Sequence, residues 1–140
     1  MAFDHKQLDR IYQRTSGYCH ICGRKLARTN YGKAGKTGAW EVEHSVPSSK
    51  GGTDHSNNLF PAHISCNREK QAVTTRTART WNGKSRAPLS PEKRKQAKTE
   101  NGVLGAACGG LAGLAIGGPI GGVIGALAGG HWGASQNPDK

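Results

Sequence analysis

The chain contains few acidic residues, few cysteines and no apolar stretch near its start. Its 140 residues include nine Asp and Glu against 20 Lys and Arg, which gives a formal net charge of +11. A basic chain of this kind favours a polyanionic partner, and nucleic acid is the most obvious one. The opening Met-Ala-Phe-Asp-His-Lys has no hydrophobic signal-peptide core. We therefore expect a reducing, cytosolic environment for the thiols.

Three of the four cysteines are spaced as metal ligands. Two residues separate Cys19 from Cys22, and the same spacing separates His63 from Cys66. The first pair can form a tight turn and the second can lie on the first turn of a helix. Three thiolates and one imidazole suit a closed, tetrahedral structural Zn2+ site. The fourth cysteine, Cys108, lies in an apolar glycine-rich stretch, where we expect a packing residue.

A second group of polar residues lies around these pairs. Glu43 and His44 are adjacent, and Asn58 and Asn67 follow nine positions apart. Hydrolysis of a phosphodiester needs an activated water, for which a histidine can act as general base. It also needs charge neutralisation at the leaving oxygen, which a divalent cation on oxygen ligands can provide. These residue types in this order predict a metal-dependent nuclease.

The stretch from about Arg10 to Lys70 resembles the HNH endonuclease family, whose fold is the ββα-metal fold. The resemblance rests on both ligand pairs and on a helix ahead of the first pair, which the sequence predicts from Asp4 to Arg14. It also rests on the run from Trp40 to Pro47, on Gly51-Gly52 and Asn58-Leu59, and on a helix opening at His63. It covers roughly the first half of the chain.

This resemblance implies a role for each polar residue. The general base would be His44, and Glu43 and Asn67 would bind the catalytic cation, Mg2+ or another divalent ion. Asn58 would hold the base and its loop. Asn67 at the last position makes the chain an HNN variant, and Glu43 stands where the family more often has Asp. His63 replaces the first cysteine of the usual second zinc pair.

Basic side chains follow the predicted site. Lys70, Arg68 and Arg76 are expected contacts to nucleic-acid phosphates, although for Lys70 a solvated helix position is an equally open interpretation. Further along, Ser90 and Pro91 predict the start of a helix. The basic residues after them could bind DNA phosphates or an anionic lipid surface.

Residues 102–130 contain no charged side chain, and glycine recurs there at every fourth position. The repeated glycines are Gly105, Gly109, Gly113, Gly117, Gly121, Gly125 and Gly129. This spacing allows apolar helices to pack closely in lipid, so the stretch resembles a glycine zipper and predicts membrane association and a possible homo-oligomer. Pro119 interrupts it. A kinked single span is favoured, while a hairpin of two short helices or a flexible or packed Gly-rich tail stays open.

The predicted fold class is α+β. Residues 1–76 form a small zinc-stapled ββα-metal nuclease domain, 77–101 a basic and partly helical linker, 102–130 the glycine zipper and 131–140 a polar tail. The basic residues ahead of the apolar stretch predict a nuclease domain on the cytoplasmic side of the inner membrane. A cytoplasmic protein or an exported effector is the alternative location.

The predicted function is hydrolysis of DNA, with RNA not excluded, by a nuclease tethered to or inserting into a membrane. A phage-defence nuclease and a toxin or effector are the two biological roles that fit. The alternative function is a catalytically idle, zinc-dependent nucleic-acid-binding module with a membrane anchor.

Overall fold

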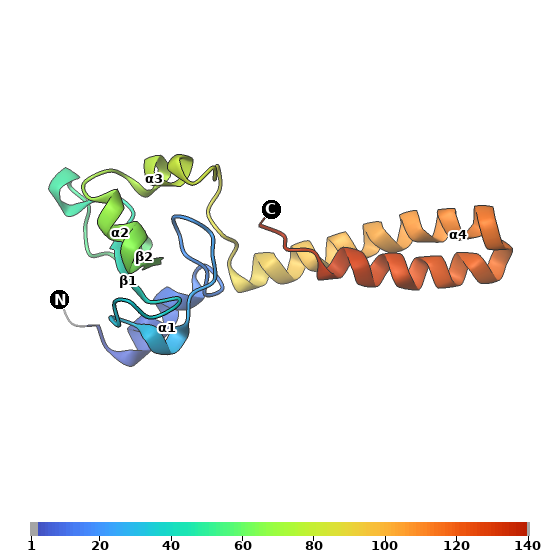
Figure 1. Cartoon of the computed structure of the whole chain (residues 1–140), viewed down its shortest axis with the longest axis horizontal. Coiled ribbons are helices and arrows are strands. Elements are labelled where there is room, and N and C mark those ends of the chain that lie inside the picture. The colour runs from blue at the N-terminus through green and yellow to red at the C-terminus, as the bar shows by residue number, and fades with distance from the viewer. Residues whose placement is uncertain (1–2, 140) are drawn as a thin grey trace. The chain divides into compact units, whose positions relative to one another are not determined.

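The computed structural model describes residues 3–139, and within this range it leaves the side chains of residues 113, 114 and 116–121 undescribed. The chain divides into two compact units, Met1–Pro91 and Glu92–Lys140. The division falls inside the stretch predicted as a linker. In chain order the elements are α1 (His5–Gln13), η1 (Arg28–Asn30), β1 (Trp40–His44), η2 (Ser48–Lys50), η3 (Ser56–Asn58), β2 (Leu59–His63), α2 (Ile64–Lys70), α3 (Thr75–Trp81) and α4 (Pro91–Ser135) (Figure 1).

The helix expected near the start of the chain is α1, and its first turn is fixed by a capping box. The Asp4 carboxylate accepts a hydrogen bond from the Gln7 backbone N–H at 2.7 Å, and the Gln7 side chain accepts one from the Asp4 N–H at 3.0 Å. This exchange satisfies two donors that the helix cannot pair internally. The helix buries Ile11 and Tyr12 against the rest of the first unit.

The two strands β1 and β2 form an antiparallel pair in which Trp40 lies opposite His63 and His44 lies opposite Leu59. Helix α2 begins at Ile64, immediately after β2 ends. The structure therefore contains the small mixed domain of helix and strand that the sequence predicts. Because the strand ends where the helix begins, His63 and Cys66 belong to consecutive elements.

The first unit has a small core built around Trp40, which is 1% exposed. The ring of Tyr12 lies 5.2 Å from it and the ring of Tyr31 lies 4.9 Å from it, measured between centroids. The other buried members of this cluster are Cys19, Ile21, Cys22, Leu26, Ala62, Cys66 and Ala78. Three of the predicted zinc ligands are thus part of the core itself. In a domain this small, a metal site is an expected substitute for missing apolar area.

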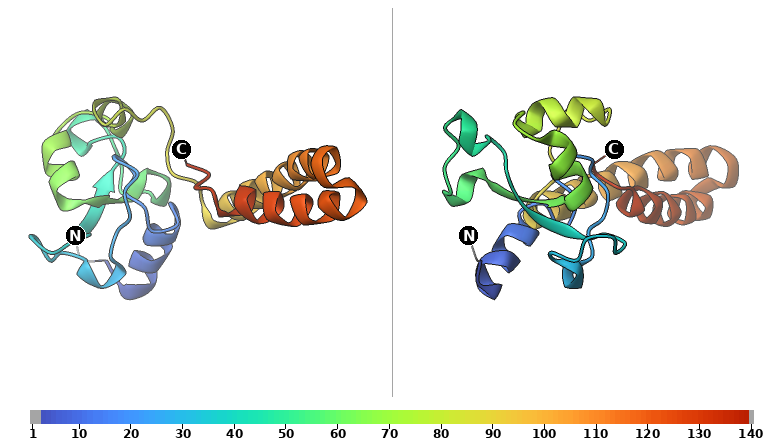
Figure 2. Two further views of the ribbon diagram at one scale, coloured as in Figure 1. Left: turned by 45° about the vertical axis from the view of Figure 1, so that its right-hand side comes forward. Right: turned by 60° about the vertical axis from the view of Figure 1, so that its left-hand side comes forward.

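The helix α4 folds back on itself as two antiparallel arms, which lie side by side in all three views (Figures 1 and 2). A methyl group added to Gly109 would lie 2.1 Å from the carbonyl oxygen of Gly125, and one added to Gly105 would lie 2.2 Å from that of Gly129. The arms therefore meet backbone to backbone, which only glycine allows. This hairpin replaces the favoured expectation of a kinked single span.

The close glycine contacts of α4 occur within one chain, so association between chains stays a prediction. Gly113, Gly117 and Gly121 fall among the residues whose side-chain surroundings the structure does not describe. No helix in the described part of the chain has the length and apolar character needed to cross a membrane.

Among the residues of α4 whose side chains the structure describes, the large apolar ones point outward. They are Val103, Leu104, Leu111, Val123, Ile124, Leu127 and Trp132, each at least 63% exposed. At the open end of the hairpin, where its first and last residues meet, the Arg94 guanidinium donates to Asn137 at 3.1 Å and forms an ion pair with Asp139. The hairpin thus has small residues inside, apolar residues outside and charged residues at its open end.

Candidate metal and nuclease site

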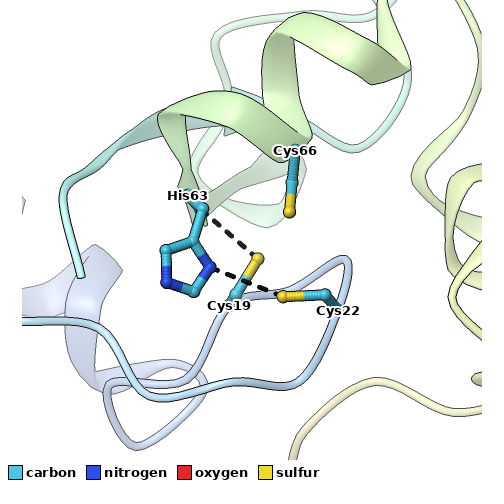
Figure 3. A group of neighbouring side chains, drawn as sticks. All are labelled: Cys19, Cys22, His63 and Cys66. Carbon is cyan, nitrogen blue, oxygen red and sulfur yellow. Dashed lines mark hydrogen bonds between the residues drawn. The ribbon is translucent and has the colours of Figure 1, made fainter. Parts of the chain in front are cut away.

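The four predicted zinc ligands meet in the structure. Their side chains point toward one another from two places, the turn that carries Cys19 and Cys22 and the junction of β2 and α2 that carries His63 and Cys66 (Figure 3). All four ligand atoms lie within 4.8 Å of one another. The Nδ1 atom of His63 lies 3.4 Å from the Cys22 sulfur, so it is the ring nitrogen that faces the group.

The crowding of these groups shifts their proton affinities. Hydrogen bonds from Cys19 and Cys66 lower the pKa of Cys22, while hydrogen bonds with Cys22 and Cys66, reinforced by burial, raise the pKa of Cys19. Interactions with Cys22 and Cys66 raise the pKa of His63 to about 9. These opposite shifts arise because the groups share protons with one another, and a bound divalent cation would displace those protons.

The donor set fits zinc. Zinc–sulfur bonds of about 2.3 Å place tetrahedral ligand atoms roughly 3.3–3.8 Å apart, and small side-chain movements would reach this spacing. Cys19, Cys22 and Cys66 are buried and His63 is partly buried, and these four side chains would fill every position around a tetrahedral metal. Such a closed site supports a structural metal rather than a catalytic one.

The predicted general base, His44, is the last residue of β1 and its side chain is 28% exposed. Asn58 clamps the loop that follows it. The Asn58 amide accepts from the Val46 N–H at 2.7 Å and donates to the carbonyls of Val46 at 3.0 Å and Thr53 at 2.9 Å. Both ends of the loop after the base are thereby held by one buried side chain.

Glu43 occupies a different environment from the one expected of a catalytic metal ligand. It is 0% exposed. His20 contacts its carboxylate at 2.7 Å through Nδ1, the Thr75 hydroxyl donates at 2.8 Å, and the Lys70 ammonium lies at 3.4 Å. Both carboxylate oxygens are engaged inside the domain, next to a positive charge. In this arrangement Glu43 does not present an oxygen atom to solvent.

Asn67 lies instead beside a different carboxylate. Its side-chain amide donates to Glu41 at 2.9 Å, and both residues are partly exposed. Because the nitrogen is held by Glu41, the amide oxygen is the atom left to bind a cation. The structure therefore pairs Asn67 with Glu41, whereas Glu43 belongs to the buried network described above.

The prediction for Lys70 was wrong in both of its forms. The residue is 3% exposed, and its ammonium donates to the backbone carbonyl of His44 at 2.9 Å. It is neither a solvated helix lysine nor an exposed phosphate contact. The reason is the buried Glu43 carboxylate, which compensates the charge of Lys70 inside the domain. Lys70 consequently ties α2 to the end of β1.

With this geometry established, the chain can be compared with known proteins. Residues 19–72 match the HNH endonuclease family. The HNH segment begins at the first zinc ligand, contains β1, β2 and α2, and spans less than half of the chain. No curated protein matches the chain. The match indicates a nuclease, and HNH domains typically bind nucleic acid.

A basic groove lies next to the zinc group of the HNH segment. Its volume is about 560 Å³, and its lining includes the cationic side chains of Arg24, Lys25, Lys36 and Arg68 but no acidic residue. Arg68 was predicted as a nucleic-acid contact, and the groove gives it three cationic neighbours. Arg76 is exposed on α3. The contacts of both residues with nucleic acid stay predictions.

The buried contacts of His20 with Glu43 and Arg79 were not predicted from the sequence. His20 lies within the first ligand pair, but it is 2% exposed and stacks on Phe60 with ring centroids 3.7 Å apart. Burial lowers the pKa of His20, although Glu43 acts in the opposite direction. Because a guanidinium can only donate, Nε2 accepts from Arg79 at 2.8 Å, which leaves Nδ1–H to donate to Glu43. No local spacing signals this network, because Arg79 lies 59 positions along the chain.

Proposed function

We propose that the first unit is a metal-dependent endonuclease that hydrolyses DNA phosphodiester bonds. The observation that carries the proposal is the position of His44 and Asn67 at the surface of the HNH segment, on β1 and α2. Lys70 ties these two elements together, because it lies one helical turn beyond Asn67 and its ammonium reaches the His44 backbone carbonyl. The proposed general base, His44, and the proposed oxygen ligand of the cation, Asn67, are thus carried by adjacent elements.

The chemistry follows from these positions. His44 takes a proton from a water molecule, and the resulting hydroxide attacks the phosphorus atom. A divalent cation, when bound, would neutralise charge on the phosphate and on the leaving oxygen. The amide oxygen of Asn67 is suited to hold that cation, and the neighbouring Glu41 carboxylate adds negative charge beside it. The buried network of Glu43 and Lys70 keeps the backbone of His44 in place.

The substrate class rests on charge. The groove lined by Arg24, Lys25, Lys36 and Arg68 offers four cationic side chains to the phosphates of a nucleic acid. Because these contacts would be to the backbone, they provide affinity without sequence specificity. We therefore expect binding that weakens steeply with salt, and a preference for DNA that is tested by offering RNA of equal length.

The direct test is cleavage of supercoiled plasmid by the purified, zinc-loaded full chain with added Mg2+ or Mn2+. Conversion to nicked or linear DNA supports a nuclease. DNA binding without cleavage at any cation concentration would favour the competing proposal, a catalytically idle zinc-dependent module. Absence of both binding and cleavage would contradict both proposals.

For the second unit we propose association with an anionic membrane surface. The outward apolar side chains of α4, such as Leu104, Leu111 and Leu127, have no partner among the inward-facing glycines. Lys93, Lys95 and Lys98 lie in the first turns of the same helix, at the open end of the hairpin. An anionic bilayer complements both features, with headgroups at the basic end and acyl chains around the apolar arms.

With this hairpin geometry, we expect the second unit to enter the bilayer from one side without crossing it. The pairs Gly105–Gly129 and Gly109–Gly125 are both centred on residue 117. An arm from residue 102 to this point would be roughly 23 Å long as a helix, short of the ~30 Å hydrocarbon core. Both ends of the hairpin would then stay on the same side of the membrane as the nuclease unit. The Lys and Arg residues ahead of the apolar stretch favour the cytoplasmic side for that unit.

Vesicle flotation of the full chain tests this proposal. We expect co-flotation with vesicles that contain phosphatidylglycerol, weaker binding to pure phosphatidylcholine, and partial release by salt. In a Trp81→Phe variant, Trp132 should be quenched by lipids brominated near the headgroup rather than deep in the chains, because Trp132 lies toward the open end of the hairpin. Protein that stays unbound and forms oligomers in solution would show that a second copy covers the apolar arms instead.

The biological role follows from where such a nuclease would act. A membrane-bound nuclease facing the cytoplasm suits defence against incoming phage DNA, and an apolar hairpin that inserts into a target membrane suits a toxin or effector. The neighbouring genes separate the two, because an immunity gene beside this one would favour the toxin and a group of phage-defence genes would favour defence.

A further inference from the structure

His44 has a carboxylate partner that the metal-dependent scheme does not use. The Nε2 atom of His44 lies 2.7 Å from an oxygen of Asp54. The His44 side chain is 28% exposed and that of Asp54 is 53% exposed, so the pair lies at the surface where a substrate can approach. We propose that Asp54 is the positioning residue for His44 and that Nδ1 is the nitrogen that accepts the proton, an inference that rests on the proposed nuclease function.

The loop that brings Asp54 to His44 is built to a fixed shape. Asn58 holds it at Val46 and at Thr53, the residue just before Asp54. Gly52 adds a steric constraint, because a methyl group at this position would lie 1.8 Å from the Val46 carbonyl oxygen. The ten-residue separation of the His–Asp pair is therefore closed by specific contacts rather than by chance proximity of two surface side chains.

A second anchor lies on the other side of Asp54. The Arg14 guanidinium donates to the carbonyl of Leu59 at 2.7 Å and to that of Asn57 at 3.4 Å, and its charged carbon lies 3.9 Å above the Phe60 ring. Arg14 and Asp54 both line a groove of about 780 Å³ between α1 and the 54–57 segment. Asp54 is thus held between the base and an open groove.

The chemistry of the pair determines which nitrogen is basic. An ionised carboxylate only accepts hydrogen bonds, so Nε2 must carry the hydrogen and Nδ1 must carry the lone pair. When Nδ1 takes a proton from water, the imidazolium is stabilised by Asp54, which stays ionised. The proton remains on His44 until solvent removes it, and the hydroxide is consumed in the attack on phosphorus. A carboxylate that fixes the tautomer and orientation of a histidine base is an established way to accelerate proton transfer.

The test has one readout that does not depend on activity. In the zinc-loaded full chain, 15N chemical shifts and long-range 1H–15N correlations of the six histidines report the tautomer of each ring, with His44 assigned by its loss in His44→Gln. We expect the Nε2–H tautomer at His44 in the wild type and a mixture in Asp54→Ala. An Nδ1–H tautomer at His44 in the wild type would overturn the proposal, whether or not the protein cleaves DNA.

Kinetics provide the second readout. Asp54→Asn should lower kcat by about 10- to 1,000-fold with little change in KM, and Asp54→Glu should recover part of the loss. Asp9→Asn is the matched control, because Asp9 is a half-exposed carboxylate in an ion pair with Arg28 away from the site. Equal kcat values for Asp54→Asn and Asp9→Asn would overturn the proposal even if the wild type is an active nuclease. An inactive wild type with the expected tautomer would contradict the nuclease and leave the positioning contact established.

Discussion

His20 contacts Glu43 and thereby joins the turn that carries two predicted zinc ligands to strand β1. Nδ1 of His20 lies 2.7 Å from the Glu43 carboxylate, and neither side chain is more than 3% exposed. His20 lies between two zinc ligands, and Glu43 precedes the predicted base, His44. Loss of zinc should therefore disturb not only the fold but also the strand that carries the base.

The first prediction separates the two carboxylates of β1. Glu43→Gln should leave the charge of Lys70 buried without its partner and lower the free energy of unfolding by about 3–5 kcal/mol. Chemical denaturation of the zinc-loaded proteins measures this. Glu41→Gln should leave stability nearly unchanged and raise the Mg2+ concentration needed for cleavage, because Glu41 is partly exposed beside Asn67. A stable Glu43→Gln variant with weakened Mg2+ dependence would show that Glu43 is the metal ligand instead.

The second prediction concerns the base. His44→Ala should reduce the cleavage rate by about 10²- to 10⁴-fold while DNA binding persists, because only proton transfer is lost. His5→Ala is the matched control, since His5 is an exposed histidine on α1, outside the loop that follows the base. Cleavage by the two variants at the same rate would exclude His44 as the base.

The third prediction concerns zinc. Cys66→Ser should release zinc and unfold or loosen the first unit, because zinc binding contributes directly to the free energy of folding. Cys108→Ser, which changes an exposed cysteine on α4, should retain the full zinc content. Elemental analysis and circular dichroism of both variants provide the measurement. Equal zinc content in the two variants would show that Cys66 is not a zinc ligand.

The fourth prediction concerns the hairpin. Gly109→Leu should separate the two arms of α4, because even a methyl group at this position would overlap the Gly125 carbonyl. Hydrogen exchange measured by mass spectrometry should then rise in residues 102–130. Ala107→Leu adds similar apolar area at an exposed position and should leave exchange unchanged. Equal exchange in both variants would argue against the packed hairpin.

Much of the first unit could be predicted because its signals are local. The two ligand pairs, the start of α1 at Asp4 and the start of α4 at Pro91 each depend on residues within four positions of one another. Such patterns predict local geometry directly, because a pair of ligands two residues apart or a helix cap is compatible with few backbone conformations.

The environments of Glu43 and Lys70 could not be predicted because long-range contacts set them. Alternation along β1 predicts that Glu43 and His44 point to opposite sides, but it does not show which side is buried. Thr75, from α3, donates to Glu43 directly, and Arg79, from the same helix, donates to the His20 ring that contacts Glu43. The sequence before α3 carries no signal of either residue. The contact between Asp54 and His44 was missed for a similar reason, since a clamped loop closes it.

The tail was only partly predictable. The four-residue glycine period indicated close helix packing, but it could not distinguish packing between chains from packing of one helix arm on the other. The decision depends on whether the chain reverses, and the interruption by Pro119 allowed both a kink and a turn.

We expect cleavage to need a second, exchangeable cation in addition to the structural zinc. The decisive measurement is the cleavage rate of zinc-loaded full chain, freed of other metals by passage over a chelating resin, as Mg2+ is titrated and the zinc content is measured at each point. We expect no cleavage without Mg2+, a saturable rise in rate at constant zinc content, and a shift of that rise to higher Mg2+ in Asn67→Ala. Cleavage at full rate with zinc alone, or a titration unaffected by Asn67→Ala, would contradict this expectation.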